Sequence, residues 1–184
     1  MSTPVLDETT RPKAPKIDGI TDAQRRQGQQ LAMIHRMHLQ QIEQVEAIMA
    51  QIEAGNTKAH QVAEAVAGLE MIRNYRLFGN LCGQECQLLT FHHTAEDRQI
   101  FPALMQGSEG LRRVVERLMY EHTIIHALLE ELETRAVALL QSPEQDNFTA
   151  LSETFRQLAA TVRSHFGYEE TELEEAIGYH GIRV

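Results

Sequence analysis

Three pairs of histidine or glutamate residues lie four positions apart along the chain. The pairs are His92 with Glu96, His122 with His126, and His165 with Glu169. An α-helix turns through about 100° per residue, so the members of such a pair lie about 40° apart on one helix face. Imidazole and carboxylate groups arranged in this way are suitable metal ligands. The spacing therefore indicates metal-binding chemistry, provided that these faces point into the protein.

The neighbours of these residues indicate that the faces do point inward. His122 lies in an apolar stripe between Met119 and Leu129, and His165 follows Val162 in another. Imidazole and carboxylate groups are costly to bury unless a partner satisfies them, and a carboxylate most of all. A lone inward histidine is usually a hydrogen-bonded core residue. Three such pairs together favour a cation as the partner.

The donor set predicts which ions bind and how many. It offers at least five imidazoles and two carboxylates with no thiolate at its centre, a mixture that suits iron, manganese or zinc. A single tetrahedral zinc ion uses four ligands and would leave the remaining candidates buried without a partner. The number of candidates therefore predicts two ions. His60 and His180 lie outside the pattern, and we expect them at the surface.

The composition argues against several other classes of protein. The chain has 184 residues and a net charge of −9, which would repel a nucleic-acid backbone. No apolar run approaches the ~18 residues of a membrane span. Cys82 and Cys86 are the only cysteines, and we expect them to be reduced, buried side chains rather than ligands. These observations predict a cytoplasmic protein that binds neither nucleic acid nor membranes.

The elements that must position the donors are helices. Apolar residues recur at steps of three and four, with no sustained two-residue alternation. The first expected helix runs from Thr21-Asp22 to Gly55-Asn56, and the next from Thr57 through Ile72. After a kink or break at 73–80, another segment runs from Leu81 to Leu104. The last two helices run from the Gly107–Gly110 turn to Ser142-Pro143, and from there to the C-terminal end, where Gly178 and Gly181 are expected to fray the helix. The second and third of these segments count as two pieces of one helix, so the fold class is all-α, an up-down bundle of four main helices.

Two regions follow from this pattern. Residues 1–20 contain three of the five prolines and few apolar side chains, so burial cannot offset their ordering entropy. We expect a disordered or extended tail there. Residues 21–184 form the helical domain.

The order of the ligands and the residues around them resemble a known family. Phe91-His92-His93-Thr94-Ala95-Glu96-Asp97, followed by Ile100-Phe101-Pro102, is similar to the signature of the hemerythrin-like, or HHE cation-binding, family. Tyr120-Glu121-His122 and His165-Phe166-Gly167-Tyr168-Glu169-Glu170 are similar to its later motifs. The likeness extends over residues 25–177. It implies a four-helix bundle around a non-haem di-iron centre, with an oxo or hydroxo bridge and two bridging carboxylates.

The resemblance also implies which residues are the ligands. It assigns His122, His126 and His165 to one iron, His35 and His92 to the other, and Glu96 and Glu169 to the bridges between them. The second iron then keeps an open position for O2, NO or peroxide.

Three choices stay open on the residues alone. The alternatives are His35 or His38 on the first long helix, His92 with Glu96 or His93 with Asp97, and Glu169 or Glu170. His38 lies nearer the centre of its apolar stripe, whereas Glu169 lies nearer the face of His165. The resemblance selects the first of each alternative. It leaves His38 as a proton donor that lines the pocket.

This ligand set predicts a protein that binds O2 or NO, because neutral imidazoles stabilise ferrous iron. Such a protein would be a carrier, sensor or scavenger. The alternative is an oxidoreductase that reduces NO or consumes peroxide at the same centre, with His38 supplying protons. An iron-repair donor is less favoured, because repair relatives carry an N-terminal cysteine and this tail has none. The remaining, less favoured interpretation is a structural module in which the metal only stabilises the helical bundle.

Overall fold

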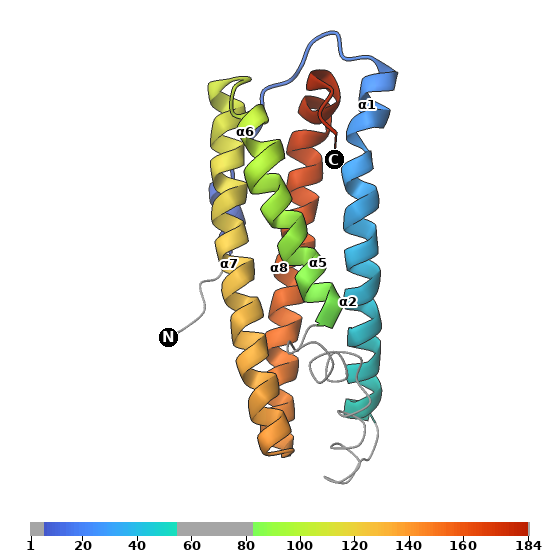
Figure 1. The fold of residues 1–184 in the computed structure, drawn as a ribbon, viewed down its shortest axis with the longest axis vertical. Helices are drawn as coiled ribbons and strands as arrows, with labels where there is room; N and C mark the ends of the chain where they lie inside the picture. Colours follow the sequence, from blue (N-terminus) through green and yellow to red (C-terminus); the bar gives the residue numbers. More distant parts are fainter. Residues whose placement is uncertain (1–5, 55–82, 184) are drawn as a thin grey trace. The chain divides into compact units, whose positions relative to one another are not determined.

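The computed structural model describes residues 6–54 and 83–183 (Figure 1). In chain order its elements are the 3-10 turn η1 (Glu8–Thr10), α1 (Asp22–Gly28), α2 (Gln30–Ala54), α5 (Gly83–Ala95), the π-helical turn η2 (Glu96–Ile100), α6 (Phe101–Leu104), α7 (Glu109–Gln141) and α8 (Gln145–His180). Every regular element in these ranges is helical, which confirms the all-α prediction. None of the helices in these ranges combines the length and the apolar character that a membrane span requires. The expectations for Thr57 through Ile72, for 73–80, for His60 and for the two cysteine side chains lie outside the part described.

The chain divides into two compact units, each with its own core. The first, which we call the site unit, comprises Met1–Met37, Phe91–Ile124 and Thr161–Val184, and the second comprises His38–Thr90 and Ile125–Ala160. The core of the site unit consists of Leu31, Ile100, Phe101, Leu104, Leu111, Val114, Val115, Leu118, Tyr168, Leu173, Ala176 and Ile177. The second unit buries Met49, Ile52, Leu89, Ile125, Leu128, Leu132, Leu139, Phe148, Leu151, Phe155 and Leu158. On α7 and α8 these residues recur at the helical steps of three and four that the sequence predicts.

Two glycines allow α1 and α8 to pack in backbone contact. A Cβ atom on Gly28 would lie 1.9 Å from the carbonyl oxygen of Glu174, and one on Gly178 would lie 1.9 Å from that of Gln24. The expectation that Gly178 frays the chain end was therefore wrong, since this glycine is buried inside α8. The helix ends at His180, and Gly181 follows it with a φ of 64°, which favours glycine.

The first long helix is interrupted early. Thr21 begins α1 with a capping box in which its side chain accepts from the backbone N–H of Gln24. We expected one helix to continue from there to Gly55, but a turn at Gln29 separates α1 from α2. The break directly follows Gly28, which has low helix propensity and is fixed against α8. The later boundary at Ser142-Pro143 is confirmed, because α7 ends at Gln141.

A π-helical turn lies in the middle of the third predicted helix. The backbone N–H of Phe101 binds the carbonyl of Glu96, five residues earlier. Pro102 has no N–H for the carbonyl of Arg98, so the regular α-helical ladder cannot pass this point. Such π turns are often found at functional sites. Here the turn begins at Glu96, one of the predicted ligands.

The segment before α1 lies against the helices of the site unit. It runs beside α7 and on to α1 (Figure 1). The hydroxyl of Tyr168 donates to the carbonyl of Pro12 at 2.7 Å, and the N–H of Ala14 donates to Glu172 at 2.6 Å. Residues 6–20 are thus extended and attached to α7 and α8, with the short turn η1 as their only regular element.

Candidate metal centre

Two groups of donor atoms meet inside the site unit. One consists of His35, His92, Glu96 and Glu169, and the other of His93, His122 and His165. Each residue offers one ligand atom, and within each group these atoms all lie within 4.8 Å of one another. They come from α2, α5, η2, α7 and α8, so every long helix of the site unit contributes at least one donor.

In the first group the imidazoles of α2 and α5 face each other. The Nε2 atoms of His35 and His92 are 3.1 Å apart. A carboxylate oxygen of Glu96 lies 3.0 Å from Nε2 of His92, one helical turn away. An oxygen of Glu169 lies 3.4 Å from Nε2 of His35.

The two carboxylates also face the second group. There the Nε2 atoms of His122 and His165 are 3.1 Å apart. The other oxygen of Glu96 lies 3.5 Å from Nε2 of His122. Glu169 approaches Nε2 of His165 at 3.7 Å. Both carboxylates therefore lie between the two groups of imidazoles, and Glu96 directs one oxygen to each.

Three of the imidazoles are anchored through their other ring nitrogen. Nδ1 of His35 is 2.9 Å from Glu170, Nδ1 of His122 is 2.9 Å from Asp97, and Nδ1 of His165 is 3.2 Å from Glu121. An ionised carboxylate only accepts hydrogen bonds, so each Nδ1 carries the proton. In a neutral imidazole the lone pair is then on Nε2, directed at the centre of the group. Carboxylate partners of this kind are typical of metal-binding histidines.

These contacts test whether a cation fits. With their protons on Nδ1, His122 and His165 direct two lone pairs at each other across 3.1 Å. The carboxylate oxygens of Glu96 and Glu169 are buried and make no hydrogen bond to the residues described. Buried groups of this kind are costly without a partner, and a cation satisfies lone pairs and carboxylates together. The donor set therefore fits metal ions at both groups.

The comparison with known families agrees with this geometry. A family model described as the hemerythrin HHE cation-binding domain matches residues 29–177. This chain belongs to that family. Comparisons with curated proteins and with solved structures gave no match. The family name describes cation binding, which the buried His and Glu groups of this HHE domain support directly.

The HHE domain's two central carboxylates differ in the direction of their pKa shifts when no metal is bound. Burial, together with the negative charge of Glu169, raises the pKa of Glu96 well above its usual range. Burial also opposes the ionisation of Glu169, but the imidazoles of His35 and His165 outweigh it and lower the pKa of Glu169 to about 2. The pKa values of the two carboxylates are therefore shifted in opposite directions.

Aromatic rings hold the imidazoles in place. Phe166 stacks on His35 with ring centroids 3.8 Å apart and planes 2° from parallel, and its edge faces His92 at 5.9 Å. Phe101 stacks on His122 at 5.5 Å. Both phenylalanines are almost completely buried. They leave the imidazoles little rotational freedom and keep water away from their faces.

Six of the seven predicted ligands belong to the two donor groups, and His93 is the additional member. His93 stacks on His122 with centroids 4.0 Å apart and faces His165 edge-on at 5.5 Å. His126 belongs to the second unit and is in neither donor group of the described residues. Its assignment as a ligand, and that of His38 as a proton donor, stay predictions. His38 is buried in the second unit, and His180 is exposed at the end of α8.

The alternatives left open by the sequence have separate roles here. His92 and His93 both face the centre, one toward His35 on α2 and the other toward His122 on α7. Asp97 and Glu170 each bind an imidazole Nδ1 instead of joining a donor group.

Glu121 and Arg11 contact the centre although neither was among the predicted ligands or proton donors. Glu121 is completely buried beside His165, and burial opposes its ionisation. Hydrogen bonds from His165, Arg11 and Arg117 outweigh that effect and lower its pKa to about 2. The signal for Glu121 was its place beside His122 within an apolar stripe. No pattern in the sequence indicated Arg11.

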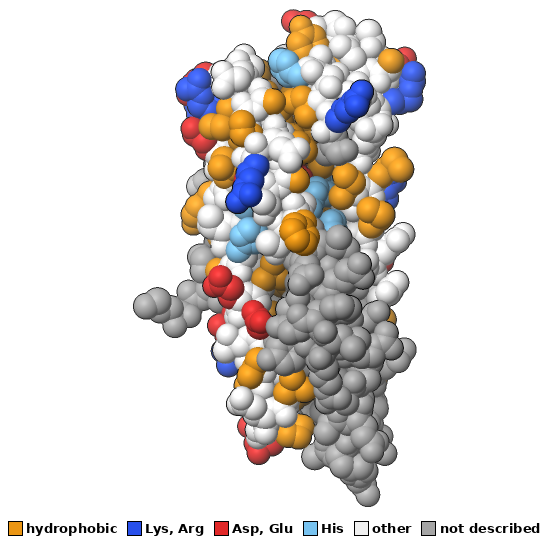
Figure 2. All heavy atoms as spheres, in the orientation of Figure 1, with side chains coloured by type: hydrophobic (Ala, Val, Ile, Leu, Met, Phe, Trp, Pro, Cys, Tyr) orange, Lys and Arg blue, Asp and Glu red, His pale blue; other side chains and the backbone are white. Residues whose placement is uncertain are grey.

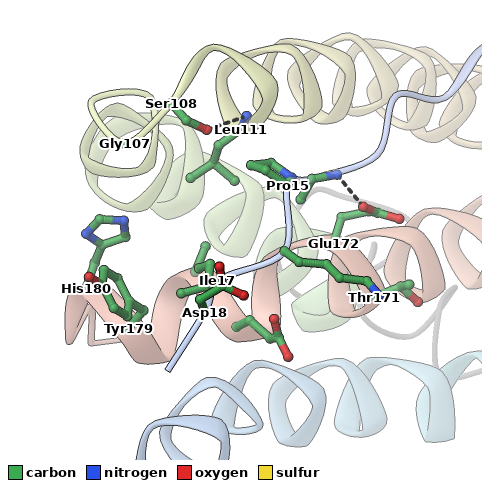
Figure 3. Close-up of a pocket in the computed structure, with 14 residues that line it drawn as sticks. Pro15, Ile17, Asp18, Gly107, Ser108, Leu111, Thr171, Glu172, Tyr179 and His180 are labelled. Atoms are coloured by element: carbon green, nitrogen blue, oxygen red, sulfur yellow. Dashed lines mark hydrogen bonds between the residues drawn. The ribbon is translucent and has the colours of Figure 1, made fainter. Parts of the chain in front are cut away.

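A pocket of about 480 Å³ lies elsewhere in the site unit (Figure 3). The end of α8, with Tyr179 and His180, lines one side, and the segment from Ala14 to Asp18 lines another. None of the seven donor residues lines this pocket. This pocket and the two donor groups are therefore separate features of the site unit.

Proposed function

We propose that this HHE domain is a non-haem di-iron protein that binds O2 or NO. The observation that carries the proposal is the position of Glu96, whose two oxygens face His92 and His122 at 3.0 and 3.5 Å. One carboxylate that serves two groups of imidazoles suits two ions bound side by side. Nitrogen and carboxylate donors without thiolates suit iron.

The two groups differ in how many imidazoles they offer. His93, His122 and His165 supply three, whereas His35 and His92 supply two in addition to the shared carboxylates. An ion held by His35 and His92 would have one imidazole fewer, which would leave room for an additional ligand. When bound, a pair of iron ions supplies an electron-rich centre to which O2 or NO can attach at that position.

The surroundings of the first group favour access from one side. The side chain of His92 is 8% exposed, whereas that of His35 is completely buried. Figure 2 shows histidine side chains that reach the surface among apolar side chains on the face that carries α5. Phe166 closes the inner side by stacking on His35. A small diatomic ligand that enters past His92 would meet imidazoles that the ring of Phe166 holds in place.

The experiment that tests the proposal is metal analysis with optical spectroscopy. The purified protein is expected to contain two iron ions per chain and to form a stable, reversible adduct when the reduced form meets O2 or NO. His122→Gln should lose iron, whereas His180→Gln, which changes an exposed histidine, should retain it. Turnover of NO or peroxide in place of a stable adduct would indicate the alternative oxidoreductase. Zinc, a single ion or no metal would contradict the proposal.

The fold proposed for the whole chain is the up-down four-helix bundle. The first piece of its second helix, from Thr57 through Ile72, falls within residues that the structure does not describe. The cytoplasmic location stays a prediction from the sequence.

A further inference from the structure

The segment from Asp7 to Ala14, which we call the N-terminal strap, is attached to two helices of the site unit. The side chain of Arg117 on α7 donates to Thr10 at 2.9 Å and also to the carbonyl of Asp7. On α8, Tyr168 and Glu172 bind the strap backbone, and Figure 3 shows the Glu172 contact. The strap is thus held at both of its ends.

Arg11 is the strap residue that enters the interior. Its guanidinium donates to Glu121 through Nε at 2.8 Å and through Nη2 at 2.8 Å, which is a bidentate ion pair. Its third nitrogen, Nη1, donates to the hydroxyl of Ser164 at 3.0 Å. The same guanidinium lies over the ring of Tyr168, 4.6 Å from its centroid. Only 11% of the Arg11 side chain is exposed.

The carboxylate that Arg11 holds is also the partner of a ligand imidazole. Oε2 of Glu121 faces both Nη2 of Arg11 and Nδ1 of His165, at 2.8 and 3.2 Å. Arg117 binds only the other oxygen, at 2.7 Å. Arg11 is therefore the cation that fixes the oxygen used by His165.

We propose that Arg11 is a positioning residue for the metal centre and that it acts through Glu121 on His165. The proposal rests on the proposed metal site. It goes beyond the family match, which begins at residue 29 and so does not include the strap. Groups that orient a ligand imidazole strongly affect metal affinity, because they fix its tautomer and direction. The strap is in this sense part of the centre.

The negative charge of the buried Glu121 carboxylate explains why its contact with Arg11 is important. Glu121 is completely buried, and a buried carboxylate needs ionic hydrogen bonds to remain charged. Without Arg11, Arg117 would still bind Oε1 of Glu121, but His165 would be the one remaining partner of Oε2 among the contacts described above. Glu121 could then rotate about its remaining anchor. The imidazole of His165 would lose its fixed direction toward the donor group.

The test measures Co²⁺ binding to the full-length, metal-free protein, with Arg11→Gln compared with Lys13→Gln. Both changes remove one positive charge from the strap, but Lys13 is exposed. Affinity is obtained by competition with a chelator, and the visible Co²⁺ spectrum reports the coordination geometry. We expect Arg11→Gln to weaken binding about tenfold and to change the spectrum. Lys13→Gln should do neither.

A double variant tests the route of the effect. Glu121→Gln alone is expected to weaken Co²⁺ binding about 10- to 100-fold. If Arg11 acts through Glu121, adding Arg11→Gln to that variant should weaken binding no further. Arg11→Lys keeps the charge but loses the bidentate contact, so its affinity should lie between wild type and Arg11→Gln. Should Arg11→Gln fail to fold, the same comparisons are made with Arg11→Lys.

The outcomes separate this proposal from the proposed function. A wild-type protein that binds no Co²⁺ overturns both. Wild-type binding that Arg11→Gln leaves unchanged, or weakens by the same factor with and without Glu121→Gln, overturns the role of Arg11 and leaves the metal site standing.

Discussion

Replacing His93 with glutamine tests which histidine completes the group of three imidazoles. The structure places His93 beside His122 and His165, whereas the sequence assigned His126. Loss of a group that merely orients a ligand costs about 10- to 100-fold in metal affinity, so loss of the donor itself should cost more than about 100-fold, or about 2.8 kcal/mol. The donors around His35 are intact in this variant. We therefore expect the iron content to fall from two ions per chain to one.

A second quantity separates the loss of a ligand from the loss of packing. His93 stacks on His122 with centroids 4.0 Å apart and planes 13° from parallel. Glutamine approximates the side-chain size but cannot stack, so the metal-free variant should lose about 0.5–1.5 kcal/mol of unfolding free energy. Thermal unfolding of the metal-free protein measures this loss. Iron analysis with chelator competition measures the binding.

The matched control is His126→Gln, which makes the same chemical change one turn after His122. If His126→Gln removes more iron than His93→Gln while both variants keep their helical content, the ligand set drawn from the structure is wrong.

Three further predictions follow from the same contacts. Glu96→Gln should abolish binding of both ions. The thermal midpoint of the metal-free protein should stay nearly unchanged, because burial already raises the pKa of Glu96 and favours its neutral form. A large drop in that midpoint would contradict this reasoning. Gly178→Ala should lower the unfolding free energy by about 1–3 kcal/mol, since its Cβ would lie 1.9 Å from a carbonyl oxygen of α1. Its control Gly167→Ala, with open space around it, should raise the unfolding free energy by about 0.5–1 kcal/mol, and equal effects in denaturant titrations would refute the packing argument. Removal of iron with a chelator should lower the thermal midpoint of the wild type, because an ion present at 100 times its Kd contributes about 2.7 kcal/mol; an unchanged midpoint would show that metal binding is not linked to folding.

The sequence determined the kind of fold and the kind of site through periodicity. Helical steps of three and four gave the all-α fold, and the boundary at Ser142-Pro143 followed from local chemistry. The same steps showed that His122 and His165 lie within apolar stripes, so their burial could be predicted. These features depend on residues close together in the chain, and local geometry is enough to derive them.

The periodicity of the sequence did not distinguish the roles of His92 and His93. The helices that lie opposite these residues determine those roles. His92 and His93 differ by about 100° around one helix, so both border the same stripe. Their roles depend on which helix lies opposite: His92 faces His35 on α2, and His93 faces His122 on α7. For the same reason Asp97 became the partner of an imidazole Nδ1.

Contacts between segments that are far apart in the chain could not be predicted from a local sequence pattern. From the sequence alone, Gly178 suggests a frayed helix end. In the structure the backbone of Gln24 packs directly against this glycine. Arg11 and Glu121 are separated by 110 positions, and a proline-rich segment with few apolar residues gives no sign that one of its arginines is buried. Only the tertiary structure brings the two together. The interaction is possible because the buried carboxylate provides the ionic partner that the arginine requires.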